Sequence, residues 1–360
     1  MPPEFRALVD PGHLGDLLPA VEIVYPKSAA PDMTVAMNEL FERFPDLEPE
    51  LLVETDDAWR FRLGWTSDPL TFVDPGVAKM AESLYGLALP EIGGYREVHR
   101  WSGRDVVFSM VHAWALLAAA LAVSRRGGRP LQWIVHVDDH TDMGELALQP
   151  MAAKGAFTDA VFRAGLVLAD PDSVISAVRR GVISKGNFLT AYLLGHPDAR
   201  VTHVGFGLED GTFELVHAEE PGTLGGRPLP RRKLIRERRG DDAGRFRRSG
   251  SLPTGVPTPG EGVWLDIDLD YFWNRYDGDS DKLDRQAEPG EGDEVMLRVE
   301  RFLAELSRVP WVTAIEAVSI AVSPGFFPAD HWASVIPVLR DGIRDILEAD
   351  PLVTTVPGGR

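Results

Sequence analysis

The sequence predicts an α/β protein in which a mainly parallel sheet is covered by helices on both faces. From residue 104 onward, short apolar runs typical of strands alternate with longer segments typical of helices, and this alternation is characteristic of βαβ units. Two of the apolar runs, 131–137 and 263–265, lead directly into acidic residues. With 360 residues, of which 44% are hydrophobic and 26% charged, the chain is long enough to bury a large core.

The first 95 residues carry mixed signals and no motif that indicates chemistry. Their apolar patterns predict a strand at 17–25 and helices at 33–44 and 74–87. The second helix has Asp74 as a cap and Pro75 in its first turn. We interpret residues 1–95 as an N-terminal extension or cap that shapes a substrate entrance, and residues 96–360 as the main domain.

The main domain begins with a strand at 105–110 and an alanine- and leucine-rich helix at 111–126, which Gly127 and Gly128 end. Further strands are predicted at 131–137, 201–207, 212–217, 263–265 and 313–322, and helices at 156–166, 172–180, 187–194, 295–309 and 329–348. The Gly- and Pro-rich stretch that ends at Gly262 is predicted as a long loop, and 277–294 as an acidic insert.

Composition excludes several classes of function. A formal net charge of -18 disfavours nucleic acid as a partner and favours a cationic substrate. No apolar run approaches the roughly 18 residues of a membrane span, and the N-terminus lacks the pattern of a signal peptide, so we expect a cytoplasmic protein with no membrane partner. The chain has no cysteine, so any metal must be held by oxygen and nitrogen.

One basic segment, from Arg227 to Arg248, interrupts the acidic chain. Because Gly, Pro and Ser flank it, we interpret it as a solvated or disordered loop. The alternative is that it docks an acidic peptide.

Acidic residues follow two predicted strands at every second position. Asp138, His140 and Asp142 follow the strand at 131–137, and the strand at 263–265 leads into Asp266, Asp268 and Asp270. In an extended chain, side chains at alternate positions lie on the same side. Ligands bind at the carboxyl ends of parallel strands, and crowded carboxylates there are tolerable only with bound cations or protons. We therefore predict a metal site.

A histidine and the charge balance refine this prediction. His112 lies in the first turn of a helix that directly follows the strand at 105–110, so it reaches the same edge. Carboxylates with imidazole and no sulfur suit Mn²⁺, with Fe²⁺, Co²⁺, Ni²⁺ or Zn²⁺ as competitors. Asp138, Asp142, Asp266 and Asp268 contribute four negative charges, which two divalent ions neutralise. A pair of metal ions activates water for hydrolysis. His136 lies deeper in the strand, so we expect a supporting or core histidine there.

These residues resemble the metal-binding motifs of the arginase and ureohydrolase superfamily in order and approximate spacing. The motifs are His112, the run 138–142 (Asp-Asp-His-Thr-Asp) and the run 266–268 (Asp-Ile-Asp). The surrounding stretches 183–189 and 265–272 are most similar to a branch that includes the peptide arginases, which convert arginine side chains of ribosomally made peptides to ornithine. The resemblance covers about residues 105–345 and implies a three-layer α/β/α sandwich.

The resemblance also implies a ligand set and a reaction. One Mn²⁺ ion would be bound by His112, Asp138, Asp142 and Asp266, and the other by His140, Asp138, Asp266 and Asp268, so that Asp138 and Asp266 bridge. Hydroxide held between the ions would attack the guanidinium carbon of arginine and release ornithine and urea.

The chain departs from the free-arginine enzymes at three places, which argues against free arginine as substrate. Phe188 to Thr190 stand where those enzymes carry an acid/base histidine, and Ala321 stands near the position of their guanidinium-binding Glu. Asp270 follows Asp268 one position too early to match their third acid. We predict Asp270 and His203 as catalytic residues, with His217 as an alternative to His203. The position of Asn187 at a helix start favours a capping role, and the alternative is that Asn187 contacts the substrate.

The expected substrate is therefore arginine within a peptide or another guanidino compound. Two other hypotheses remain open at this stage. One is an agmatinase-like or deacetylase-like enzyme that hydrolyses an amidine or amide of a small metabolite. The other is a metal-stabilised module that binds a peptide without turning it over. Association into a homo-oligomer also remains open.

Overall fold

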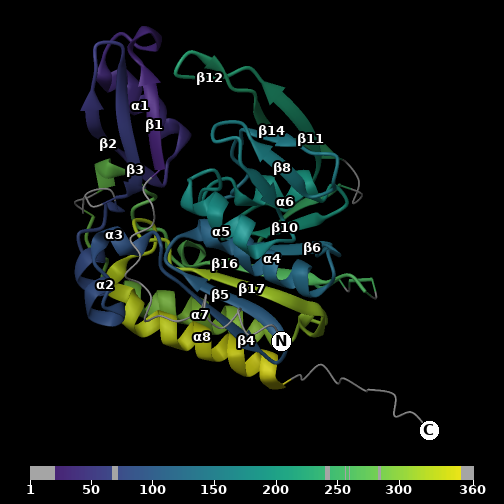
Figure 1. The fold of residues 1–360 in the computed structure, drawn as a ribbon. Helices are drawn as coiled ribbons and strands as arrows, with labels where there is room; N and C mark the ends of the chain where they lie inside the picture. The colour runs from purple at the N-terminus through teal and green to yellow at the C-terminus, as the bar shows by residue number, and fades with distance from the viewer. Residues whose placement is uncertain are drawn as a thin grey trace.

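A nine-stranded mixed sheet forms the centre of the molecule (Figure 1). The computed structural model describes residues 21–66, 72–239, 244–255, 257–258, 260–282 and 285–349. Six neighbouring strands in the middle of the sheet pair in parallel; in spatial order they are β15 (Phe246–Ser249), β10 (Arg200–Val204), β6 (Trp133–Val137), β16 (Val263–Asp268), β17 (Ile315–Ala321) and β5 (Arg104–Ser109). The predicted α/β class is confirmed.

Antiparallel strands complete both edges of this sheet. At one edge β4 (Arg96–Trp101) pairs with β5, and at the other β11 (Gly211–Glu220) lies between β15 and β14 (Arg231–Arg239). Strand β4 was not predicted, because the first strand that we expected in the main domain begins at residue 105. An edge strand with one exposed face carries a weaker apolar signal than a buried parallel strand.

Helices cover both faces of the sheet. One core joins the sheet to α4 (Ala115–Arg125), α5 (Pro171–Arg179) and α6 (Phe188–Gly195), and another joins it to α2 (Val77–Tyr85), α7 (Glu291–Leu306) and α8 (Trp332–Ala349). In β6, Ile134 belongs to the first core, whereas Val135 and Val137 belong to the second. The same two-residue period puts His136 and Asp138 on the α4 side.

The N-terminal residues form a small sheet of their own with a separate core. Its antiparallel strands are β1 (Val21–Pro26), β3 (Ala58–Trp65) and β2 (Leu47–Glu54), in that spatial order, and α1 (Met33–Arg43) packs against them. The predicted helix at 33–44 and the strand ending at 25 are confirmed, although 17–20 lie outside the described residues. The β2–β3 hairpin was not predicted. In Figure 1 this unit stands at the upper left, above α3 (Leu89–Ile92).

The helix predicted at 156–166 is wrong. This stretch contains β8 (Ala156–Asp159) and β9 (Gly165–Val167), which form a three-stranded antiparallel sheet with β7 (Leu148–Pro150). The carboxylate of Asp159 accepts hydrogen bonds from the backbone N–H groups of Val161 and Phe162, and Arg163 has a φ of 58°. A side-chain-capped turn and a left-handed residue are incompatible with a continuous helix.

The long loop predicted up to Gly262 is also wrong, because it contains β14, β15 and the short strands β12 (Thr223–Leu224) and β13 (Arg227–Pro228). The basic residues of β14 lie beside the acidic end of β11, since the register places Arg232 opposite Glu219. Ion pairs join Arg232 to Glu219 at 2.7 Å and Arg231 to Glu145 at 2.9 Å. Opposite charges on the two neighbouring strands stabilise the pairing of β11 with β14. The net charge of the basic segment alone does not reveal this pairing.

The remaining helical predictions are confirmed within a few residues. The helix predicted at 74–87 begins at Val77, the one at 295–309 begins earlier at Glu291, and the one at 329–348 is preceded by a turn of 3-10 helix at Ala329–His331. Among the helices that the structure describes, none is both long and apolar enough to cross a bilayer.

Candidate metal centre

The candidate site is assembled by the pairing of β6 with β16. These strands are parallel neighbours, and their register places Asp266 beside His136. One residue pair further, Ile267 lies beside Val137, so Asp268 and Asp138 follow at the carboxyl ends of both strands. His112 enters from the short helical turn His112–Trp114 that follows β5 and precedes α4. The side chains are brought together by strand register.

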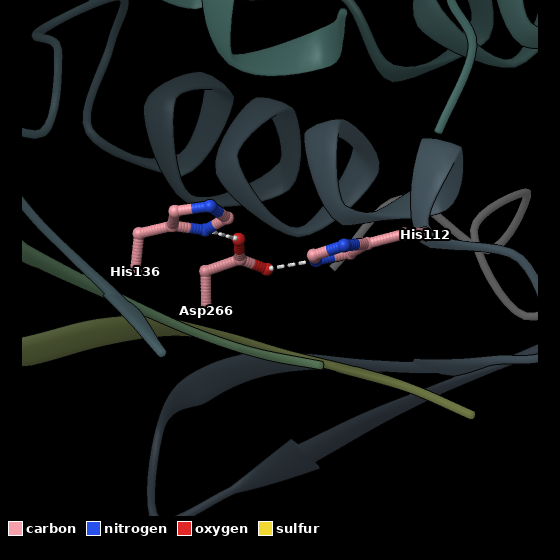
Figure 2. A group of neighbouring side chains, drawn as sticks. All are labelled: His112, His136 and Asp266. Atoms are coloured by element: carbon pink, nitrogen blue, oxygen red, sulfur yellow. Dashed lines mark hydrogen bonds and ion pairs between the residues drawn. The ribbon is translucent and has the colours of Figure 1, made fainter. Parts of the chain in front are cut away.

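Asp266 connects two histidines at the base of the cluster (Figure 2). Its Oδ1 atom lies 3.1 Å from His112 Nε2, and its Oδ2 atom lies 2.8 Å from His136 Nδ1. All three residues are at most 2% exposed. His136, which we expected to be a supporting or core histidine, therefore contacts a predicted metal ligand directly.

The other ring nitrogen of His112 is surrounded by three carboxylates. His112 Nδ1 lies 3.2 Å from Asp138 Oδ2, 2.8 Å from Asp142 Oδ2 and 2.9 Å from Asp268 Oδ2. One imidazole nitrogen carries at most one proton, so it cannot donate to all three. The Oδ2 atoms of Asp138 and Asp142 are buried and accept no hydrogen bond from the described residues.

This geometry fits a bound cation. Within the described part of the chain, four groups of three His or Asp residues offer ligand atoms that all lie within 4.8 Å of one another. The donor atoms are imidazole nitrogens and carboxylate oxygens, which suit Mn²⁺ and the borderline divalent ions. Buried carboxylate oxygens without hydrogen-bond donors are costly, and a cation would satisfy them. The buried His and Asp groups could therefore hold a metal ion.

Burial and neighbouring charges shift the pKa values of these groups strongly. Burial opposes ionisation of Asp266, but the charge on His112 and hydrogen bonds from His112 and His136 outweigh it and hold the pKa at about 2. Burial and the charge of Asp138 raise the pKa of Asp142 to about 7. Burial would lower the pKa of His112, but Asp266 and the neighbouring carboxylates raise it well above its ordinary value. Without a cation, the cluster retains protons.

His140 is partly exposed and pairs with the buried Asp270. His140 Nδ1 lies 2.9 Å from Asp270 Oδ2 and 3.6 Å from Asp138 Oδ1. These carboxylates raise the pKa of His140 to about 12. Burial and the charges of Asp268 and Asp138 raise the pKa of Asp270 well above its ordinary value. Asp270, which we predicted as a catalytic residue, thus contacts the predicted ligand His140, and the two side chains are close enough to share a proton.

Two serines that the sequence analysis missed support the carboxylates. Ser319 Oγ donates to Asp266 Oδ1 at 2.5 Å and Ser323 Oγ donates to Asp268 Oδ2 at 2.5 Å. Trp264 Nε1 in turn donates to Ser319 Oγ at 2.8 Å. The sequence indicates these two serines only through a pattern: small or polar residues stand at alternate positions 319, 321 and 323, as the acids do at 266 and 268. Residues at alternate positions of a strand lie on the same face.

The other predicted residues lie outside this cluster. His203 is buried on β10 beside His136, and its Nε2 donates to the backbone oxygen of Asp138 at 3.0 Å. Burial and the charge of His136 lower the pKa of His203 to about 3, so this imidazole is neutral. His217 is exposed on β11. The Asn187 side chain accepts a hydrogen bond from Ser184 N at 2.8 Å.

Residues from both the N-terminal unit and the main domain line two cavities, and the smaller one reaches the cluster at His112. The smaller one, about 100 Å³, is lined by residues that include His112, Asp46, Trp65, Lys185 and Phe326. The larger one, about 680 Å³, is lined by residues that include Asn187, Gly186, Glu145, Glu42 and Arg43. Residues 21–66 therefore form part of the walls beside the candidate metal centre.

Comparison with models of protein families and with curated proteins finds no match for this chain. Its membership of the arginase superfamily remains a prediction from the motifs.

Proposed function

We propose that the protein is a dinuclear Mn²⁺ hydrolase with an arginase-like three-layer fold that converts peptidyl arginine to ornithine and urea. The observation that carries this proposal is the buried convergence of three carboxylates on one nitrogen of His112, beside a cavity. This convergence agrees with the resemblance to the superfamily, because the converging residues are those of the ordered motifs. The negative net charge of -18 suits a cationic substrate.

The residues of the site divide into two neighbouring sets. His112, Asp138, Asp142 and Asp266 would hold one ion, and His140, Asp138, Asp266 and Asp268 the other. When bound, the two ions supply a water molecule with a pKa lowered towards neutrality. Asp270 contacts the second set through His140, so it would either support that ligand or contact the substrate.

The reaction requires a proton donor for the departing amine. Water adds its oxygen to the guanidinium carbon, the bond between this carbon and the side-chain nitrogen breaks, and that nitrogen must gain a proton. Asp270 is the strongest candidate among the described residues, because its Oδ2 lies 2.9 Å from Nδ1 of His140 and this pair can hold a proton and pass it on. His203 is a weaker candidate, because its donor nitrogen bonds to backbone.

The test is mass spectrometry of arginine-containing peptides and of free arginine after incubation with the Mn²⁺-loaded protein. Asp138→Asn and Asp266→Asn are the inactive variants. Asp105→Asn is the matched control, because this carboxylate lies on the same sheet but pairs with Arg125 at 2.9 Å, away from the cluster. Ornithine should form in the peptide with the unchanged protein and the control, and should be absent with both site variants.

Other outcomes would redirect the proposal. Metal binding without product from any guanidino substrate would favour an amidine or amide hydrolase. Tight peptide binding with no product from any substrate class would favour the binding module. Ornithine formed equally by Asp266→Asn would contradict the assignment of the site.

A further inference from the structure

Asp46 lines the cavity beside His112, and one of its carboxylate oxygens has no hydrogen-bond partner among the described residues. Asp46 Oδ2 accepts a hydrogen bond from the backbone N–H of Lys185 at 2.8 Å. Asp46 Oδ1 is buried and accepts none. Because leaving a buried acceptor unsatisfied is costly, this atom calls for a donor that the described residues do not supply.

Asp46 comes from the turn between α1 and β2, in the N-terminal unit, and reaches the main domain through its bond to Lys185. Trp65 and Phe326 also line the cavity. A carboxylate with aromatic neighbours is the chemistry that recognises a planar cation, which donates hydrogen bonds from its edge and stacks through its face.

Lys185 also lines this cavity, together with Asp46 and His112. Its ammonium lies 5.1 Å from the centre of the Phe326 ring, and its backbone N–H donates the hydrogen bond to Asp46. Burial raises the pKa of Asp46, and the charge of Lys185 opposes this rise. A bound cation would favour the ionised carboxylate in the same way.

We propose that Asp46 binds the guanidinium group of the substrate in the cavity beside His112. This inference rests on the proposed function, and it names a recognition residue for a site in which Ala321 stands near the position of the usual acid. It also gives the N-terminal unit a role in specificity.

The experiment measures binding of two fluorescein-labelled peptides that differ only in one residue, arginine or its neutral analogue citrulline. Binding is followed by anisotropy with the full chain treated with chelator, so that turnover does not interfere. Asp46→Asn retains an acceptor for Lys185 N–H but loses the charge. Glu50→Gln is the matched control, because Glu50 is an exposed carboxylate on β2 that contacts Arg62 at 3.5 Å.

The unchanged protein and Glu50→Gln should prefer the arginine peptide over the citrulline peptide. Asp46→Asn should bind the arginine peptide about 10- to 100-fold more weakly and bind the citrulline peptide unchanged, as expected for loss of a charged hydrogen bond. Lys185→Met removes a competing positive charge and should strengthen arginine binding by up to about fivefold.

Three results would overturn the inference: no preference for arginine in the unchanged protein, a preference that survives in Asp46→Asn, or an equal loss in Lys185→Met, which would indicate general damage to the cavity. Ornithine formation by the Mn²⁺-loaded protein is measured separately. An Asp46-dependent preference without ornithine would support the cation site and reject the proposed reaction. Ornithine formation with a preference for arginine that does not depend on Asp46 would support the proposed reaction and reject the cation site at Asp46.

Discussion

Loading the metal-free protein with Mn²⁺ should stabilise it strongly, because the carboxylates around His112 lack enough donors of their own. Asp138, Asp142 and Asp268 all approach a single nitrogen. Any ligand that binds only the folded state stabilises it by about 2.7 kcal/mol at a free concentration 100 times its Kd. Two ions at that ratio would add about 5.4 kcal/mol to the free energy of unfolding.

The expected change in melting temperature follows from the chain length. An unfolding entropy of about 2.1 cal/mol/K per residue, taken over 360 residues, amounts to about 0.76 kcal/mol/K. The melting temperature should therefore rise by about 7 °C when both sites fill. A single ion would give about half of this rise.

Differential scanning calorimetry of chelator-treated protein, before and after titration with Mn²⁺, measures this shift. Asp266→Asn should lose most of it, since Asp266 contacts both His112 and His136. Asp105→Asn, on the same sheet but outside the cluster, should retain it. A shift below about 1 °C in the unchanged protein, which is far under the value expected for one ion, or an equal shift in Asp266→Asn, would refute the metal-site argument.

Three further predictions concern protons and peptide docking. The pKa of Asp142 is raised to about 7 in the metal-free protein, so protons compete with Mn²⁺, and raising the pH from 6 to 8 should increase Mn²⁺ affinity with net proton release. Calorimetry in two buffers of different ionisation enthalpy measures this release, and a pH-independent affinity would contradict the expectation. Asp270→Asn should lower ornithine formation by about 10²- to 10⁴-fold if this residue supplies the proton; urea release measures it, and unchanged turnover would remove Asp270 from catalysis. If β14 docks an acidic peptide, replacing Arg231, Arg232 and Lys233 by Glu should weaken binding of that peptide in anisotropy and leave metal content unchanged, whereas unchanged affinity would reject the docking idea.

Local patterns were sufficient for the elements that carry the candidate metal centre. Strands β6 and β16 are short apolar runs buried on both faces, and their carboxyl ends carry acids at alternate positions. Period and burial are properties of a few consecutive residues, so they can be recognised without the rest of the fold. The same applies to α4, whose residues from Ala115 to Val123 are all buried.

Predictions failed where the decisive partner is distant in the chain. Strand β14 looked like a solvated basic loop because the acids that neutralise it belong to β11 and to Glu145. The stretch 156–166 looked helical because its apolar residues have mixed spacing, and only its packing as β8 and β9 selects the turn at Asp159.

Sequence alone determined that His112, Asp138 and Asp266 belong to one chemical unit, because their residue types and strand-end positions require a cation or protons. Only the tertiary structure decided what surrounds them. Ser319 supports Asp266 because β17 pairs with β16, and Asp46 enters the adjoining cavity from a unit 139 residues away from its partner Lys185. Side-chain recognition acts over a few ångströms, so partners separated by this many residues become neighbours only through the fold.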